Sequence, residues 1–500
     1  MLRKIRTTLA IVFFTLTTLL FLDFTGTIQG WLGWLAKIQF LPAVMALNVG
    51  VIFLLLLLTF VCGRVYCSVI CPLGIFQDVV SWISGKRKKK QFRFFYSPAK
   101  SLLRYGVLFL FVLALIMGIG SIAALLAPYS AYGRIAQNLF APLYDLGNNA
   151  LAYMAERMDN YAFYQKEIWI KSLPVFLIAA ATFVILILLA WRNGRTYCNT
   201  ICPVGTVLGF VAKYSLFRPV IDITKCNSCT LCSRQCKAAC IDPKNHTIDY
   251  SRCVTCLDCV DACKHNAIHY ISRLGFPLKT KDTNMVGLDG TNASRRNFLT
   301  GTGMFLGTSL LKAQEKKVDG GYATIVDKKV PDRQTPIVPP GAISLANMAA
   351  HCTGCQLCVS VCPNGVLRPS TGLDTLIQPE SSYERGYCRP ECVKCSEVCP
   401  AGAILKITKA EKSSIQVGHA VWVKENCIPL TDGKSCGNCA VHCPTNAITM
   451  VLSDSGNPES LKIPVVNEER CIGCGACENL CPARPLSAIY VEGHERHKYI

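Results

Sequence analysis

Long apolar stretches occupy the first two fifths of the chain, and beyond them cysteines recur at short intervals. Three stretches without a charged residue, 42–61, 105–129 and 173–191, each reach or approach the roughly 20 residues that a membrane-spanning helix needs. A fourth, 7–22, is shorter and follows three basic residues. Because no small-residue cleavage site comes after it, we expect a signal anchor and not a cleaved signal peptide. The pattern therefore predicts four transmembrane helices.

The distribution of charge predicts how these helices are oriented. Segment 86–104 contains eight Lys and Arg residues and no acidic residue, whereas loop 130–170 contains three basic residues against four acidic ones. By the positive-inside rule the basic segment is cytoplasmic, and with four helices the N-terminus and the chain after residue 191 are cytoplasmic too. The alternative for the basic segment is specific binding of anionic lipid or of a protein partner.

A twelve-residue motif is present twice in the apolar region. Residues 63–74 (GRVYCSVICPLG) follow the second predicted helix, and residues 194–205 (GRTYCNTICPVG) follow the fourth. Two equivalent halves predict a pseudo-symmetric pair of hairpins that brings the motifs together. Four cysteines meeting there suit a further cluster or a soft metal ion such as Cu(I), with a redox dithiol or simple packing as alternatives. The four are Cys67, Cys71, Cys198 and Cys202.

The cysteines beyond the apolar region indicate iron–sulfur clusters. The chain has 30 cysteines among 500 residues, in closely spaced groups unlike the scattered cysteines of short disulfide-bonded proteins. Residues 226–236 and 253–263 each have the spacing C-x2-C-x2-C-x3-C of bacterial ferredoxins, in which the fourth cysteine reaches the neighbouring cluster. Lys237 and Lys264 replace the usual proline after the fourth cysteine. The two predicted ligand sets are Cys226, Cys229, Cys232 and Cys263, and Cys253, Cys256, Cys259 and Cys236.

Four more cysteine quartets, each ending in Cys-Pro, follow residue 351. Two have the regular spacing, one has an extra residue in its first gap, and one has an eight-residue first gap. We predict four further [4Fe–4S] clusters with nested pairing of the quartets, outer with outer and inner with inner; sequential pairing is the alternative. The nested ligand sets are Cys352, Cys355, Cys358 and Cys481; Cys471, Cys474, Cys477 and Cys362; Cys388, Cys392, Cys395 and Cys443; and Cys427, Cys436, Cys439 and Cys399.

Other cofactor classes fit the composition less well. Zinc ribbons also use paired cysteines, but six quartets with this spacing favour iron–sulfur clusters. All eight histidines lie at or beyond residue 246, so the apolar region has no axial histidine for haem, and no CxxC is followed by His. The formal charge of +20 comes without a nucleic-acid-binding motif. Cys62 and Cys240 lie outside the quartets, and we interpret both as structural.

Residues 294–299 (SRRNFL), followed by a stretch rich in Gly, Thr and Leu, resemble a twin-arginine export signal. The alternative is a surface arginine pair before a short amphipathic helix. Because iron–sulfur clusters are assembled in the cytoplasm, a ferredoxin destined for the periplasm has to cross the membrane already folded. A folded-export signal just before the four-cluster region meets that need. Residues 311–313 make a poor cleavage site, so we expect the exported part to stay tethered.

These patterns predict an α-helical membrane domain of four transmembrane helices in two pseudo-repeated hairpins, plus two α+β bacterial ferredoxin-like [4Fe–4S] modules. The predicted divisions are the transmembrane domain, 1–215; a cytoplasmic two-cluster ferredoxin, 216–275; a linker, 276–293; the twin-arginine signal or anchor, 294–313; a second linker, 314–345; and a periplasmic four-cluster ferredoxin, 346–500.

The apolar stretches, the two Gly-Arg-x-Tyr-Cys-x3-Cys-Pro motifs and the two-cluster ferredoxin resemble the NapH-type membrane component of quinol dehydrogenases. The twin-arginine segment and the four-cluster module resemble its NapG-type partner, so the chain is similar to a fusion of the two. The resemblance implies a multi-pass protein of the bacterial inner membrane, in contact with lipid and the quinone pool. It would oxidise menaquinol or ubiquinol and pass electrons to a periplasmic reductase or cytochrome, without haem and without nucleic acid. No catalytic or quinone-site residue can be named from the sequence.

An accessory role is the alternative function. Related polyferredoxin membrane proteins serve maturation of nitrous oxide reductase or copper handling for terminal oxidases, and they resemble the first 275 residues equally well. A third alternative is a subunit that docks on a larger complex with the quinone site elsewhere. The predicted export of the four-cluster module favours the quinol dehydrogenase.

The export hypothesis predicts that changing Arg295 and Arg296 together to Lys keeps the C-terminal module in the cytoplasm, because twin-arginine translocation requires the pair. Protease added to spheroplasts should then no longer digest this module, while it digests the module of the unchanged chain. Digestion in the double variant would contradict the predicted topology.

Overall fold

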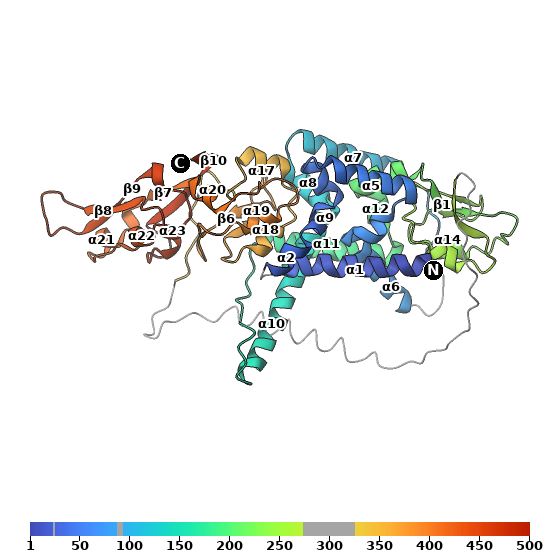
Figure 1. Cartoon of the computed structure of the whole chain (residues 1–500), viewed down its shortest axis with the longest axis horizontal. Coiled ribbons are helices and arrows are strands. Elements are labelled where there is room, and N and C mark those ends of the chain that lie inside the picture. Colours follow the sequence, from blue (N-terminus) through green and yellow to red (C-terminus); the bar gives the residue numbers. More distant parts are fainter. Residues whose placement is uncertain (24–25, 88–93, 274–325) are drawn as a thin grey trace.

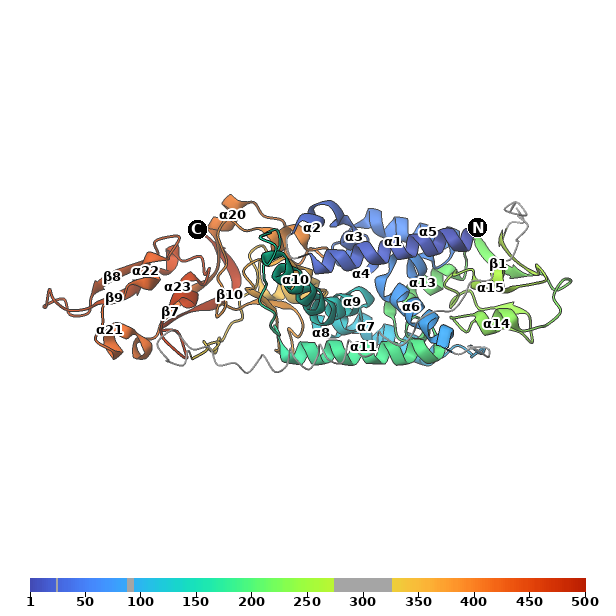
Figure 2. The same ribbon diagram turned by 90° about the horizontal axis from the view of Figure 1, so that it is seen from below.

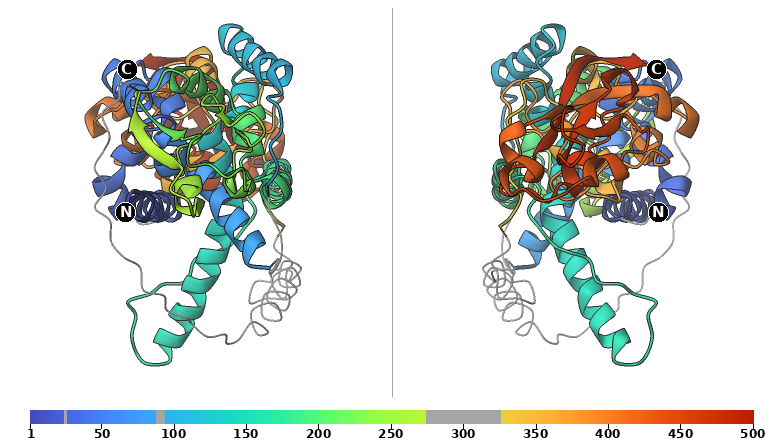
Figure 3. Two further views of the ribbon diagram at one scale, coloured as in Figure 1. Left: turned by 90° about the vertical axis from the view of Figure 1, so that its right-hand side faces the viewer. Right: turned by 90° about the vertical axis from the view of Figure 1, so that its left-hand side faces the viewer.

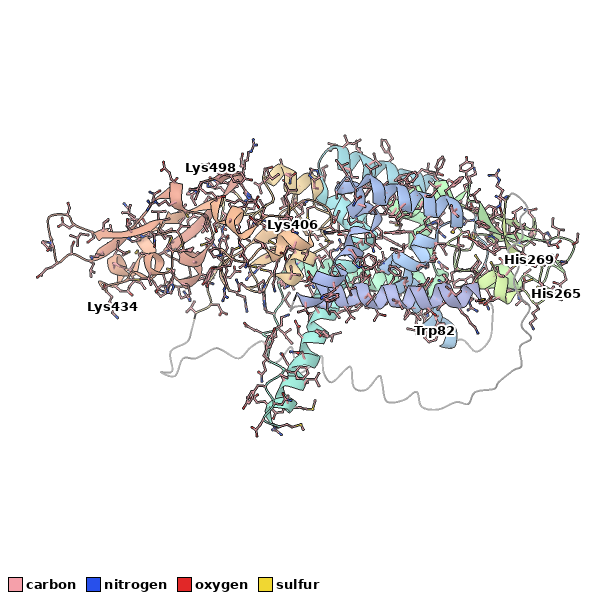
Figure 4. The ribbon with its side chains drawn as sticks, viewed as in Figure 1. Trp82, His265, His269, Lys406, Lys434 and Lys498 are labelled. Atoms are coloured by element: carbon pink, nitrogen blue, oxygen red, sulfur yellow. The ribbon has the colours of Figure 1, made fainter. Side chains whose placement is uncertain are left out.

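The computed structural model describes residues 1–23, 26–87, 94–273 and 326–500 (Figure 1). Residues 1–215 form a central helical domain, residues 216–273 form an N-terminal cysteine module at one end of it, and residues 326–500 form a C-terminal cysteine module at the opposite end (Figures 1 and 2). His265 and His269 mark the outer part of the first module, and Lys434 marks that of the second (Figure 4). The predicted linker 276–293 and twin-arginine segment 294–313 lie outside the described residues.

The helical domain contains two turns of π-helix, η1 (Tyr66–Ile70) and η2 (Ala136–Phe140), among its α-helices. The α-helices are α1 (Leu2–Leu22), α2 (Thr27–Leu32), α3 (Trp34–Lys37), α4 (Phe40–Met45), α5 (Val49–Cys62), α6 (Pro72–Arg87), α7 (Ser101–Ile116), α8 (Gly120–Leu126), α9 (Pro128–Ile135), α10 (Ala141–Glu156), α11 (Leu173–Asn193), α12 (Thr196–Thr200) and α13 (Pro203–Ala212).

Two of the four predicted spanning helices form as expected. Helices α1 and α11 have 21 residues each, and within the described residues they are the two helices long and apolar enough to cross a membrane. The prediction of one continuous helix over 42–61 was wrong, because the chain turns at Leu47 (φ +51°) and the Asn48 side chain accepts a hydrogen bond from Val51 N to start α5. Composition does not reveal such breaks in an apolar run.

The run 105–129 is also broken into shorter helices. Helix α7 ends before Gly118, whose φ of +73° suits glycine, and the chain then forms α8 and α9. All eight residues of α9 are buried, and the helix packs against α6 and α11 in the middle of the domain. Helix α10 leaves the domain and projects sideways from it (Figures 1 and 3).

The two motifs have matching local structures. Gly63 and Gly194 end α5 and α11 with φ values of +73° and +65°, a backbone region that favours glycine. A helical turn follows in each half, η1 in the first and α12 in the second. The proline after the last motif cysteine then stands at the start of α6 or α13, where a missing N–H costs nothing. The sequence repeat therefore corresponds to a structural repeat.

The N-terminal cysteine module has two short helices and two small antiparallel sheets. Strand β1 (Phe217–Ile221) pairs with β4 (Ile268–Ser272), and β2 (Ile241–Asp242) pairs with β3 (Thr247–Ile248). Its helices are α14 (Leu231–Gln235) and α15 (Asp258–Ala262).

The C-terminal cysteine module contains three antiparallel strand pairs. They are β5 (Leu367–Pro369) with β6 (Pro379–Ser381), β7 (Ile415–Trp422) with β10 (Ile489–Tyr499), and β8 (Ile448–Leu452) with β9 (Lys462–Val466). The helices are α17 (Leu345–His351), α18 (Leu357–Val361), α19 (Lys394–Val398), α20 (Lys409–Ser414), α21 (Ile428–Thr431), α22 (Asn438–Val441) and α23 (Ala476–Leu480), with 3₁₀ turns at Lys424–Asn426 and Glu468–Arg470. Short helices and strand pairs of this kind support the predicted α+β modules.

Asp78 on α6 joins the helical domain to the N-terminal cysteine module. Its carboxylate accepts a hydrogen bond from Arg195 Nε at 2.8 Å and lies 3.6 Å from Lys237 Nζ of the module. Arg6 Nη1 of α1 lies 3.3 Å from the same carboxylate. Burial alone would raise the pKa of Asp78, but these cations hold it well below its usual range. Asp78 therefore stays charged and fastens three parts of the chain together.

We predict that Asp78→Asn lowers the free energy of unfolding by about 3 kcal/mol, because it leaves the fully buried Arg195 without its carboxylate partner. Thermal unfolding of the full chain in detergent measures the effect. Asp222→Asn is the control, since Asp222 pairs with Lys225 at the surface and its loss should change little. Equal unfolding temperatures for the two variants would contradict the role of Asp78.

Candidate metal centres

The two quartets of the N-terminal cysteine module exchange their fourth cysteines, as predicted. The Cys232 sulfur lies within electrostatic range of Cys226, Cys229 and Cys263, which together we call site 1. The Cys259 sulfur lies close to those of its own triplet and of Cys236 in the same way. Site 2 consists of Cys236, Cys253, Cys256 and Cys259, which line one enclosed, apolar cavity.

The structure gives roles to two residues near site 2. Cys240, which we interpreted as structural, also lines this cavity, and its sulfur lies 3.5 Å from that of Cys236. Lys237, which replaces the usual proline, pairs with Asp258 of α15 at 2.9 Å in addition to its contact with Asp78. The departure from the ferredoxin pattern at Lys237 therefore serves docking on the helical domain.

The quartets of the C-terminal cysteine module pair sequentially, and the predicted nested pairing was wrong. Cys399, predicted to join Cys427, lies close to the triplet beginning at Cys352. Cys481 lines a cavity together with the triplet beginning at Cys427. The four sets are site 3, Cys352, Cys355, Cys358 and Cys399; site 4, Cys388, Cys392, Cys395 and Cys362; site 5, Cys471, Cys474, Cys477 and Cys443; and site 6, Cys427, Cys436, Cys439 and Cys481.

The physical reason for sequential pairing is local packing. Helix α18, which contains Cys358 and ends just before Cys362, packs against α19 of the second quartet. Helix α22 packs against α23 in the same way. Each pair of neighbouring quartets therefore forms one compact two-site unit, whereas nested pairing would need contacts across the whole module.

The surroundings of the sulfurs fit iron–sulfur clusters. Backbone N–H groups point at the fourth cysteine of several quartets: Ala267 N lies 3.2 Å from Cys263 Sγ, and Ala447 N lies 3.2 Å from Cys443 Sγ. Ala488 N donates to Cys481 Sγ at 3.3 Å. Hydrogen bonds of this kind stabilise cluster-bound thiolates and tune their potentials.

The six sites follow one another along the long axis of the molecule. Sites 4 and 5 meet where Cys388 N donates to Cys474 O at 2.9 Å, and the Tyr383 hydroxyl beside them donates to Gly473 O at 2.8 Å. Site 3 contacts the helical domain through Thr353 and Cys355. Helices α21 and α22, beside the triplet of site 6, lie towards the far end of the molecule (Figure 1). The C-terminal cysteine module therefore forms a row of four sites leading away from the helices.

Site 3 is anchored on the helical domain through α9 and its neighbours. The Ser130 hydroxyl donates to Thr353 O, and Lys171 Nζ donates to Val359 O at 3.2 Å. A Cβ at Gly133 would collide with the Cys355 carbonyl oxygen, so glycine allows this close approach. The triplet loop of site 3 is thus built into the interface.

The four motif cysteines also come together, as the repeat predicted. All four are buried, and the Cys202 sulfur lies within electrostatic range of those of Cys67, Cys71 and Cys198. They lie in the same apolar core as Cys256 of site 2 and Cys355 of site 3. The motif cysteines therefore lie in the helical domain between the two modules.

Comparison with family models supports these sites. Models of a 4Fe–4S binding domain match residues 43–91 with 173–223, and residues 246–269. Models of a 4Fe–4S dicluster domain match residues 351–404 and 434–484. The first dicluster match contains all ligands of sites 3 and 4, in agreement with sequential pairing.

Curated relatives place the chain in a family. The ferredoxin-type protein NapG of Escherichia coli (strain K12) is 32% identical over 175 residues, which cover 32% of this chain and 74% of NapG. The chain belongs to the NapG/MauM family of ferredoxin-type proteins. The methylamine utilization ferredoxin-type protein MauM of Paracoccus denitrificans is 31% identical over 174 residues, 32% of this chain and 75% of MauM.

A shorter ferredoxin-type protein is also similar. NapF of Escherichia coli (strain K12) is 25% identical over 179 residues, 36% of this chain and 99% of NapF. No solved structure matches the chain. The chain is an iron–sulfur electron-transfer protein of this ferredoxin-type family, with several 4Fe–4S binding domains.

Several residues that shape the sites escaped the sequence analysis. Asp78 and the two motif arginines, Arg64 and Arg195, hold the motif cysteines and site 2 in place. The repeat itself contained a signal for the arginines, because both motifs have Arg directly after Gly. Asp78 occurs in only one half, and nothing in the sequence singles it out.

Sequential pairing predicts the effect of Cys399→Ala on native-state alkylation of the full chain. Loss of this ligand should empty site 3 and increase severalfold the labelling of Cys352, Cys355 and Cys358 by iodoacetamide, as measured by mass spectrometry. Cys481→Ala is the matched control and should instead increase labelling of Cys427, Cys436 and Cys439. The opposite pattern, with Cys399→Ala exposing the triplet of site 6, would contradict sequential pairing and support nested pairing.

Proposed function

We propose that the protein oxidises quinol in the bacterial inner membrane and passes the electrons through its C-terminal cysteine module to a periplasmic acceptor. The observation that carries the proposal is the placement of the two cysteine modules at opposite ends of an apolar helical domain (Figure 1). An electron carrier built in this way connects two sides of a membrane. Helices α1 and α11, both long and apolar enough to span, support this placement.

The proposed orientation has the N-terminal cysteine module in the cytoplasm. Arg3, at the start of α1, forms ion pairs with Asp258 at 2.9 Å and Asp261 at 3.1 Å, so the chain begins at the N-terminal cysteine module. The described end of the basic segment, 94–104, contacts the same module, because Phe94 N donates to Arg234 O and Ser97 N donates to Ala239 O. By the positive-inside rule this end is cytoplasmic, and the C-terminal cysteine module is then periplasmic.

The residues of the chain prepare each site for electron transfer. [4Fe–4S] clusters at sites 1–6 would each carry one electron at a time. Sites 2, 3, 5 and 6 each contain at least two buried cysteines, and backbone N–H groups offset the charge of the thiolates. Site 1 is the more open one, with Cys229 exposed.

Family membership alone does not identify the electron acceptor. One group of relatives, MauM, is named for methylamine utilization, whereas NapG is not. The names of the relatives therefore do not point to one common electron acceptor. The acceptor proposed here is a periplasmic reductase or cytochrome, and the donor is menaquinol or ubiquinol. The alternative function is an accessory role in metalloenzyme maturation, and the menaquinol experiment below distinguishes the two.

We predict that menaquinol added without oxygen to the full chain in lipid produces EPR signals of reduced clusters, and that a quinone-site inhibitor abolishes them. Cys352→Ala should prevent quinol from reducing sites 4–6, because site 3 stands between them and the helical domain. Cys226→Ala, which affects the outermost site of the other module, is the matched control and should leave their reduction unchanged. If menaquinol reduces no cluster that dithionite reduces, the accessory role is favoured instead.

A further inference from the structure

We propose that Cys67, Cys71, Cys198 and Cys202 bind a seventh iron–sulfur cluster between sites 2 and 3. The inference deepens the proposed function and rests on it only for the direction of electron flow. Two cysteines come from each half of the repeat, so the site forms only when both halves fold together. All four have side chains with at most 5% exposure.

Two arginines cross between the halves and fix the four cysteines. Arg64 Nη2 of the first motif donates to Cys198 O at 3.2 Å, and Arg195 Nη1 of the second donates to Cys67 O at 2.6 Å. The last glycine of each motif makes room for the arginine of the other. A Cβ at Gly205 would lie 2.8 Å from Arg64 Nη2, and one at Gly74 would lie 2.7 Å from Arg195 Nη1. Each half of the repeat therefore supplies the arginine that holds a cysteine of the other half in place.

The charge of Arg64 indicates an anion at this site. Its side chain is fully buried, and its hydrogen-bond partners among the described residues are neutral: Cys67 Sγ, Asn199 Oδ1 and the carbonyl oxygens of Cys198, Ser251 and Arg252. In the described part of the chain no carboxylate forms an ion pair with it, in contrast to Arg195 with Asp78. A buried guanidinium without a counter-charge is costly. Cysteine thiolates on a cluster would supply that negative charge.

Hydrogen-bond donors already point at the sulfurs. Gln77 Nε2 lies 3.2 Å from Cys198 Sγ, and Gly205 N lies 3.3 Å from Cys202 Sγ. Arg64 Nη2 lies 3.8 Å from Cys67 Sγ. The N–H donors to Cys263, Cys443 and Cys481 in the two modules have the same character. The motif cysteines thus share the sulfur environment of the proposed cluster ligands.

The position of the site suits electron transfer between the modules. Arg64 also donates to Ser251 O and Arg252 O, just before the first ligand of site 2. On the other side, the Tyr197 hydroxyl donates to Leu126 O at 3.1 Å, and α9 runs from there to site 3. Without the motif cysteines, the helical domain would separate sites 2 and 3 by its full length.

An iron–sulfur cluster fits the buried cationic Arg64, the donors to the sulfurs and the family comparison. The 4Fe–4S binding model matches both motif-containing segments, 43–91 and 173–223. The cluster would accept one electron from a neighbouring reduced centre and pass it on, with no bond made or broken.

The test is the iron and acid-labile sulfide content of the full chain, purified without oxygen in lipid. Six clusters give about 24 iron atoms per chain and seven give about 28. We expect the higher value for the unchanged protein, and a loss of about four iron atoms in the double variant Cys67→Ala/Cys198→Ala. Cys62→Ala is the matched control, because Cys62 precedes the first motif but is not among the four; its iron content should stay unchanged.

A second variant tests the site without removing a ligand. Gln77→Met keeps the size of the side chain but removes the hydrogen bond to Cys198 Sγ. We expect full iron content and a shift in the midpoint potential of one cluster to a lower value, with the signals of the two modules unchanged. A mere packing role for Gln77 would move no potential.

The outcomes separate this inference from the proposed function. About 24 iron atoms in the unchanged protein, or no loss of iron in a folded Cys67→Ala/Cys198→Ala variant, overturns the seventh cluster even if quinol reduces the protein. Four alkylatable thiols at these positions in the purified, iron-replete protein overturn it as well. Loss of about four iron atoms supports it even if quinol proves not to be the donor.

Discussion

Two buried guanidinium groups cross between the halves of the helical domain. The positions of the motif cysteines and of the N-terminal cysteine module depend on them. Arg64 and Arg195 each leave their own motif and bind the cysteine carbonyl of the other. A charged group is expensive to bury unless its hydrogen bonds are satisfied, so the pair tolerates little displacement. The same two arginines extend outward, Arg195 to Asp78 and Arg64 to the loop before Cys253. The same two arginines therefore fix both the core of the helical domain and the contact between this domain and the N-terminal cysteine module.

The two junctions of the helical domain are built differently. At the N-terminal cysteine module, charges dominate: Asp78 and Asp258 face Arg3, Arg6 and Lys237. At the C-terminal cysteine module, close backbone approach dominates, with Gly133 against Cys355 and Ser130 on Thr353. Both arrangements bring one cysteine of a triplet, Cys256 or Cys355, into the apolar core of the helices. This placement suits electron transfer, since it brings sites 2 and 3 against the core that holds the motif cysteines.

The sequence predicted those features that depend on local spacing. The crossed pairing of sites 1 and 2, the ends of α11 and the meeting of the two motifs all follow from short-range patterns. Features that depend on tertiary contacts could not be predicted in this way. Sequential pairing follows from the packing of α18 on α19, and hydropathy alone did not show the breaks at Leu47 and Gly118. The role of Lys237 became clear only when Asp78 was placed beside it.

The central claim, that the helical domain conducts electrons to the C-terminal cysteine module, can be measured directly with an artificial donor in place of quinol. The full chain is inserted into sealed vesicles with the N-terminal cysteine module outside, and ferricyanide, which does not cross the membrane, is trapped inside. Dithionite added outside should then reduce the trapped ferricyanide in vesicles that contain the protein and not in empty ones. If the clusters of the outer module are reduced while the trapped ferricyanide stays oxidised, the proposed route across the helical domain is wrong.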